Sequence, residues 1–65
     1  MIYYVVRHMA HEAYPTIQAG ELRWYGRPRD FKHSQDEAER WRQYILDTSE
    51  DPMFDDDLIV VSVDV

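Results

Sequence analysis

The sequence contains no cysteine, so the chain can form neither a disulfide framework nor a zinc site built on thiolates. Small secreted domains usually depend on one of these devices, and their absence favours a reducing compartment. No apolar run approaches the ~18 to 20 residues that a membrane-spanning helix requires, and the first residues lack the charged start and long apolar stretch of a signal peptide. We therefore expect a cytoplasmic protein without a membrane partner.

Basic side chains are also scarce, because 7 lysines and arginines are set against 13 aspartates and glutamates, which gives a net charge of -6. This charge disfavours direct binding to nucleic acid, so the expected partner is a protein with a basic surface. Apolar residues make up 45% of the chain and aromatic residues 14%, which argues against disorder. We expect residues 1–65 to form one domain with a small core, whose stability homodimer formation would increase.

Three segments have the clear patterns of β-strands. Residues 2–7 are β-branched and aromatic without a helical period, which is typical of a strand covered on both faces. Residues 21–25 alternate between polar and apolar side chains, and residues 16–18 could add a short strand before a turn. Residues 58–65 form the strongest strand pattern, with an apolar ladder on one face. The members of this ladder are Ile59, Val61, Val63 and Val65.

A helix is predicted to begin at Ser34, whose hydroxyl can accept a hydrogen bond from the backbone N–H of Glu37 while the Glu37 side chain reaches back. The helix is expected to end near residues 47–48, before a polar segment without periodicity. Apolar residues at spacings of three and four give it one apolar stripe. The residues of this stripe are Ala38, Trp41 and Ile45.

The order strand, strand, helix, strand predicts an α+β fold, in which a small three- or four-stranded sheet carries one helix packed on one face. The apolar stripe of the helix and the apolar ladder of residues 58–65 should cover each other. The polar loop of residues 26–33 joins the second strand to the helix, with Phe31 turned inward.

The sequence shows no motif for catalysis. His8, His11 and Glu12 would converge on a metal ion only in a helical turn, and His33 is remote, so solvent-exposed loop histidines are the preferred interpretation. No serine has an activating motif, and the two glycines are isolated rather than part of a phosphate-binding loop. We therefore expect no enzymatic activity, no cofactor and no metal site.

Residues 23–32 combine cations with aromatic rings, which together can follow phosphates and stack on bases. The candidate nucleic-acid-binding residues are Arg23, Trp24, Tyr25, Arg27, Arg29 and Lys32. In the competing interpretation, Trp24 and Phe31 belong to the core while the arginines keep the loop soluble and pair with nearby acids. The negative charge of the chain favours this second interpretation.

Acidic side chains gather between the predicted helix and the last strand, around the apolar pair of residues 53–54. Aromatic rings framed by carboxylates suit docking to a basic protein surface. The candidate partner-binding residues are Glu50, Asp51, Phe54, Asp55, Asp56 and Asp57. In the alternative interpretation this segment is a solvated connector, and Phe54 folds back onto the core.

Residues 29–41, which include the capped helix start, and the valine-rich residues 58–65 resemble small proteins encoded by phages and other mobile elements. The likeness covers roughly the C-terminal half of the chain. It implies an inhibitor of host defence, such as an anti-CRISPR protein, that acts in the host cytoplasm and presents carboxylates where a nucleic acid would bind.

The leading hypothesis is therefore a non-enzymatic inhibitor that binds the basic surface of a host nucleic-acid-processing or defence protein. The expected contact is the acidic segment of residues 50–57 together with exposed acids of the predicted helix. One alternative is a nucleic-acid-binding accessory protein that uses residues 23–32. Another is a small structural or assembly subunit that dimerises through an exposed strand edge.

Overall fold

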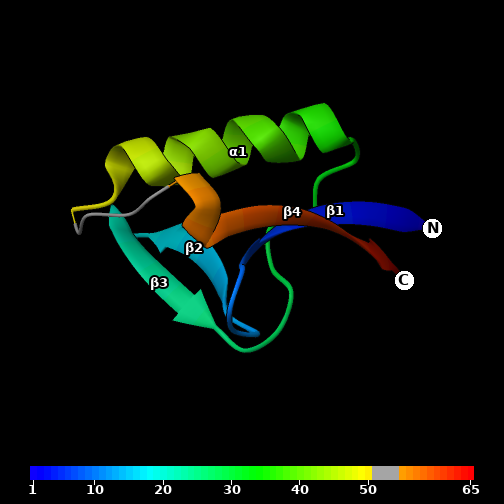
Figure 1. The fold of residues 1–65 in the computed structure, drawn as a ribbon, viewed down its shortest axis with the longest axis horizontal. Coiled ribbons are helices and arrows are strands. Elements are labelled where there is room, and N and C mark those ends of the chain that lie inside the picture. The colour runs from blue at the N-terminus through cyan, green and yellow to red at the C-terminus, as the bar shows by residue number, and fades with distance from the viewer. Residues whose placement is uncertain (51–54) are drawn as a thin grey trace.

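The structure is a computed structural model that describes residues 1–50 and 55–65, and it has the predicted α+β class. One helix lies over the pair formed by the first and last strands, and a shorter hairpin packs beside them (Figure 1). The elements in chain order are β1 (Ile2–His8), β2 (Tyr14–Gln18), β3 (Glu21–Tyr25), α1 (Gln35–Thr48), the 3-10 helix η1 (Asp55–Asp57) and β4 (Leu58–Asp64). Within the described residues, no helix has the length and apolar character needed to cross a membrane.

The strands form two antiparallel pairs, β1 with β4 and β2 with β3, in place of the single sheet of three or four strands expected from the sequence. The second edge of β1 is occupied at Tyr4 by the loop before α1. The Tyr4 N–H donates to the Lys32 carbonyl at 2.9 Å, and the Lys32 N–H donates back at 2.8 Å. A loop segment therefore takes the place beside β1 that a further strand would need.

The hairpin of β2 and β3 turns through two residues. Ala19 and Gly20 have φ angles of 51° and 78°, and positive φ at both central positions is the requirement of a type I′ turn. This turn fixes the register that places Ile17 opposite Leu22. The short strand predicted at residues 16–18 is confirmed as part of β2.

The core lies between α1 and the β1–β4 pair. Val6, Ile45 and Leu58 are fully buried and form its centre. Val5 is also fully buried, and because neighbouring strand residues point to opposite faces, β1 is covered on both sides as predicted. The half-buried residues packed against this centre are Leu22, Trp41, Leu46 and Val60.

The predicted orientation of β4 is wrong. The register pairs His8 with Leu58 and Val6 with Val60, and of these Val6, Leu58 and Val60 pack in the cluster that contains Ile45 of α1. The apolar ladder of Ile59, Val61 and Val63 therefore lies on the opposite face and stays half-buried. Alternation identifies which residues share a face, but both faces of this strand begin with apolar residues, so the pattern does not show which one meets the helix.

The predicted start and end of the helix are confirmed. The Ser34 hydroxyl accepts a hydrogen bond from the Glu37 N–H at 3.2 Å, and α1 ends at Thr48. Ala38 and Ile45 are fully buried, so the predicted stripe is the face that meets the core.

Two aromatic residues considered for the core are exposed. Phe31 is 42% exposed, because the bridge between Tyr4 and Lys32 turns Lys32 towards α1 and leaves Phe31 on the other face, edge-on to Tyr3 at 5.8 Å. Trp24 is 39% exposed and meets the His8 ring edge-on at 5.9 Å. The inward placement predicted for Phe31 is therefore wrong.

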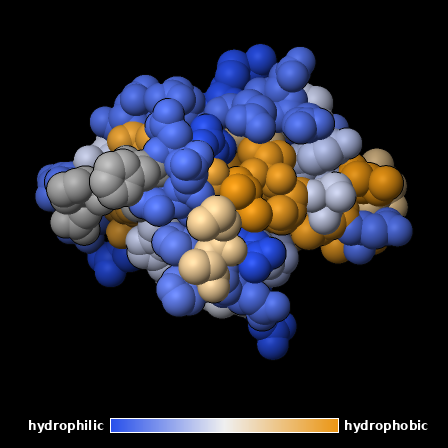
Figure 2. Space-filling model, in the orientation of Figure 1, coloured by the Kyte–Doolittle hydropathy of each residue, from blue (hydrophilic) through white to orange (hydrophobic). Residues whose placement is uncertain are grey.

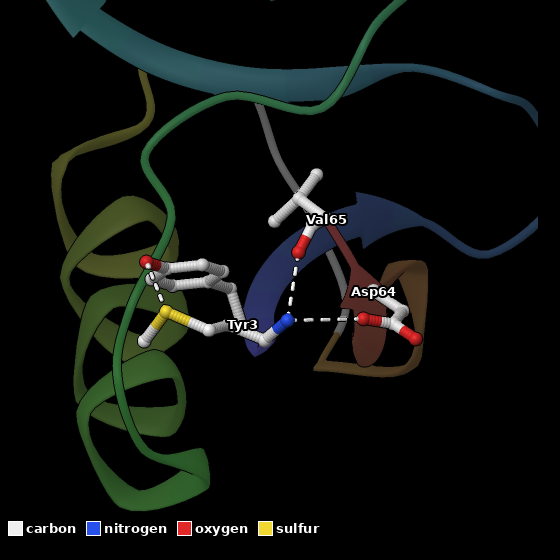
Figure 3. A network of polar contacts seen from close by, with 4 residues as sticks. Tyr3, Asp64 and Val65 are labelled. Atoms are coloured by element: carbon white, nitrogen blue, oxygen red, sulfur yellow. Dashed lines mark hydrogen bonds and ion pairs between the residues drawn. The ribbon is translucent and has the colours of Figure 1, made fainter.

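The β1–β4 ladder extends one residue beyond both strands at the end where the termini meet. The Val65 N–H donates to the Met1 carbonyl at 2.9 Å. The Met1 amino group donates to the Val65 carbonyl at 2.7 Å and lies 3.3 Å from an Asp64 carboxylate oxygen (Figure 3). In the same figure the Tyr3 hydroxyl points to the Met1 sulfur. These contacts close the ladder at the terminal end.

Candidate partner-binding site

The histidines take part in local contacts. The rings of His8 and His11 stack at 5.0 Å, and His8 Nδ1 accepts a hydrogen bond from the Ala10 N–H at 3.1 Å. His33 lies against Tyr3, with ring centroids 5.5 Å apart. Among residues 1–50 and 55–65, no group of three histidine or acidic side chains is placed to hold a metal ion.

The six residues of the basic and aromatic stretch do not form one surface. Trp24 and Tyr25 are neighbours in β3, so their side chains point to opposite faces. The Arg29 guanidinium lies 3.5 Å from the centre of the Tyr25 ring, and the Lys32 ammonium lies 4.7 Å from the centre of a Trp41 ring on the helix. These cations are already placed over aromatic rings of the protein itself.

Arg23 is likewise engaged, since its guanidinium lies 2.7 Å from the Glu21 carboxylate. Arg27 is exposed in the loop after β3. The stretch therefore lacks the continuous row of cations and uncovered rings that a nucleic-acid track needs.

On the acidic side, Asp55, Asp56 and Asp57 form η1 and lead directly into β4. Asp55 and Asp56 are exposed, and Asp57 is half-buried. Asp51 and Phe54 lie outside the described residues. Glu50 is exposed but borders a different hollow, next to β3, so the structure does not bring it together with η1.

Arg42 of α1 fixes η1 against the start of β4. Its Nε donates to the Leu58 carbonyl at 2.7 Å, and its Nη2 donates to the Asp55 carbonyl. Hydrogen bonds from a charged donor are stronger than neutral ones, and the bond to Leu58 is partly buried while the bond to Asp55 is exposed. The side chain of one helical residue therefore holds the backbone of the acidic segment and leaves the Asp55 carboxylate exposed to solvent.

We call these two hydrogen bonds of Arg42 the Arg42 clamp. Beside it lies an open groove of about 590 Å³ between α1 and the first half of β4. Carboxylates of Glu39, Asp55 and Asp56 stand along it, and its apolar side is formed by the chain from Leu58 to Val60 together with Met9. Met9 is 54% exposed. Figure 2 shows hydrophobic side chains gathered over β4 and continuing towards the end of the molecule where the termini lie.

The outer edge of β4 is open along most of its length. The ladder bonds at its two ends, Met9 N–H to the Asp57 carbonyl and Val65 N–H to the Met1 carbonyl, are both 2.9 Å. Antiparallel bonding alternates, so in this register the odd-numbered residues of β4 bond to β1 and the even-numbered ones point outward. Within the described residues, the backbone groups of Val60 and Ser62 have no hydrogen-bond partner.

Several residues of this site were not identified by sequence reasoning. Met9 reaches the groove only because the β1–β4 ladder continues past His8, and Arg42 reaches it because α1 packs beside the start of β4. Glu39 is an exposed acid of the helix, a group that the sequence did suggest as part of the contact. The exposed edge of β4 was anticipated only in general terms, as a route to dimers. The predicted acidic residues near the groove are Asp55 and Asp56, with Asp57 adjoining.

No family model, no curated protein and no solved structure matches this chain.

Proposed function

We propose that this chain is a non-enzymatic binding protein whose target is a basic surface on another protein. The observation that carries the proposal is the groove beside β4, where carboxylates of Glu39, Asp55 and Asp56 border an apolar strand. The net charge of -6 acts in the same direction. An apolar floor favours burial, while carboxylates around it favour a positively charged partner and raise the rate of encounter.

Binding through this groove would leave the rest of the molecule unchanged. Because Arg42 holds the backbone of η1 and not its carboxylates, Asp55 and Asp56 can meet a partner without disturbing the fold. The groove is therefore arranged before binding, and little ordering entropy opposes association.

We further propose that the target is a host protein that processes nucleic acid, or a defence protein of that kind. Such proteins carry basic surfaces that bind phosphates, and an acidic surface can compete with the nucleic acid for them. Binding of this kind is inhibition by occupancy, and it requires no catalytic group.

The test is a comparison of two variants with equal charge change. The first carries Asp55→Asn and Asp56→Asn, and the control carries Asp47→Asn and Glu50→Gln, which neutralise exposed acids that do not line the groove. Tagged wild type and both variants are incubated with host extract, once with and once without nuclease treatment, and retained proteins are quantified by mass spectrometry. The affinity of each retained protein is then measured with purified components at two salt concentrations.

We expect one retained protein to bind the groove variant about tenfold more weakly and the control nearly as well as wild type, with the wild-type affinity falling as salt rises. Equal weakening by both variants would mean that net charge, and not the groove, attracts the partner. Recovery that disappears on nuclease treatment would contradict the proposal and favour the nucleic-acid-binding alternative.

A further inference from the structure

β4 has the features of a strand that accepts another strand. It is 7 residues long, and its sequence from Leu58 to Asp64 contains no proline, glycine or lysine. Exposed edge strands are usually protected from association by short length, by proline, by lysine or by bulges. The described part of the chain places no other segment against the outer edge of β4.

The hydrogen-bonding groups of this edge are intact. Val60 and Ser62 each direct an N–H and a C=O outward, in the alternation that an antiparallel partner strand requires. At Leu58 the outward carbonyl already accepts from Arg42, so strand pairing can begin just after this residue. The edge thus presents consecutive donor and acceptor pairs beyond the Arg42 clamp.

The side chains around the edge determine what an added strand would contact. On the helix side lie Leu58 and Val60, and on the opposite face lie the half-buried Ile59, Val61 and Val63. Cross-strand neighbours stabilise a sheet when both are apolar or β-branched. A strand added here would therefore be apolar or β-branched on both faces in its central part.

The charges along the groove argue against a second copy of this chain as the occupant. Arg42 is the cation among the groove residues, and it already donates to two backbone carbonyls. A second β4 carries no basic side chain that could meet Asp55 or Asp56, and each copy has a net charge of -6. Like charges brought together in this way oppose self-pairing.

We propose that β4 binds an extended segment of a different protein as an added strand, and that this segment is apolar in its centre and flanked by lysine or arginine. This proposal rests on the proposed function, since it specifies how the basic partner is recognised. Main-chain hydrogen bonds to Val60 and Ser62 give affinity, and the basic flanks select the partner by meeting Glu39, Asp55 and Asp56.

The first experiment uses synthetic peptides in place of the unidentified partner. A peptide of alternating valine and threonine with lysines at both ends is titrated into isotope-labelled protein, and backbone amide shifts are recorded by NMR. We expect the largest shifts at Val60, Ser62 and Asp64. We expect about tenfold weaker binding when the peptide amides that face β4 are N-methylated, because the donors are lost. Exchanging the lysines for glutamates should weaken binding by a similar factor.

The second experiment changes the protein at Ser62, whose N–H points away from β1. Ser62→Pro removes the outward donor and obstructs the edge, whereas Ser62→Ala keeps the donor and serves as the control. Since edge strands accept proline where the N–H faces solvent, the fold should persist, as circular dichroism and the melting temperature will show. We expect Ser62→Pro to bind the lysine-flanked peptide at least about tenfold more weakly than Ser62→Ala.

The outcomes separate this inference from the proposed function. Suppose that Ser62→Pro binds the lysine-flanked peptide as well as Ser62→Ala does, while the Asp55→Asn and Asp56→Asn variant binds it weakly. The proposed function of the acidic groove is then supported, and strand addition is wrong. If amides of η1 and β4 both remain unshifted at peptide excess, strand addition is overturned. If Ser62→Pro fails to fold, the N-methylated peptide still decides, because unchanged affinity for it would contradict the inference.

Discussion

β2 and β4 each pair with one other strand in the described residues, but their opposite sides differ. In β2 the two-residue turn puts Gln18 and Glu21 in a hydrogen-bonded pair, so the alternation directs the backbone nitrogen of Pro15 away from β3. Proline has no N–H, and the outer side of β2 therefore lacks a donor at Pro15. β4 keeps its outward donors at Val60 and Ser62.

The two strand pairs also differ in what surrounds them. The hairpin is short and satisfies its polar groups locally, as in the hydrogen bond of 2.7 Å from the Tyr25 hydroxyl to Gln18. The β1–β4 pair supplies the buried Val6 and Leu58 to the core and still leaves an apolar edge exposed. The comparison indicates that the outer side of β2 is a poorer template for a further strand than the outer side of β4, whose donors and acceptors are intact.

The largest expected effect compares the stability lost when a backbone N–H of β4 is removed on the side facing β1 and on the outer side. In Val61→Pro the lost N–H belongs to the ladder with Val5, so we expect a loss of about 3 kcal/mol or more in the free energy of unfolding. Ser62→Pro should cost less than about 1 kcal/mol, because its N–H faces outward. Urea denaturation followed by circular dichroism measures both. Equal losses would show that the inner and outer sides of β4 are not distinct.

A second pair of variants compares the contributions of the two strand pairs to the core. Leu58→Ala removes a fully buried side chain that contacts Val6 and Ile45, and we expect it to cost about 3 kcal/mol. Leu22→Ala, in the hairpin, removes a half-buried side chain and should cost about 1 kcal/mol. Thermal and urea unfolding provide the comparison, and a larger loss at Leu22 would reverse the order of the two regions.

The third prediction concerns the contribution of the Arg42 hydrogen bonds to the stability of η1. Arg42→Ala removes donors to the Leu58 and Asp55 carbonyls, and we expect a loss of about 1.5 kcal/mol. The exposed Arg40 provides the control, since Arg40→Ala should change stability by less than about 0.5 kcal/mol. Hydrogen exchange at the amides of η1 should quicken in the Arg42 variant and not in the control. Unchanged exchange in both would mean that Arg42 does not hold the acidic segment.

The smallest effect is a gain in the hairpin. Ala19 adopts φ of 51°, which is unfavourable for alanine, and Gly20 follows it at 78°. Ala19→Asn gives the Asn-Gly pair that type I′ turns prefer, and we expect about 0.5 kcal/mol of added stability. The melting temperature should rise, while binding to the lysine-flanked peptide stays as in wild type. Weaker peptide binding would connect the hairpin to a surface from which we consider it separate.

Local patterns predicted the local structure well. Ser34 and Glu37 marked the start of the helix because a cap depends on residues three positions apart. The adjacent Val5 and Val6 indicated a strand covered on both faces, and both are buried. These features depend on neighbours in the sequence, so the sequence alone was sufficient.

The candidate site depends on contacts between distant residues, and there the sequence was insufficient. The acids of η1 were visible as a charged run, but nothing local connected them to Arg42 or to Met9. The wrong face was chosen for β4 because Ser62 interrupts the face that begins with Leu58 and Val60, although the core needs only those first two residues. The β1–β4 pair is open at β4 because Lys32 pairs with Tyr4 on the other edge of β1. The periodicity of the sequence does not predict this pairing.

The pairing of β1 with β4 also has a consequence for how the chain folds. These partners are separated by the hairpin and the helix, so the ladder forms only after a long loop has closed, which is entropically costly and slow. During synthesis, Val5 and Val6 emerge before Leu58 and the rest of β4, which follow only after the hairpin and the helix. Until β4 is available, the apolar strand β1 has no partner strand. We expect the nascent chain to be most prone to aggregation in that interval.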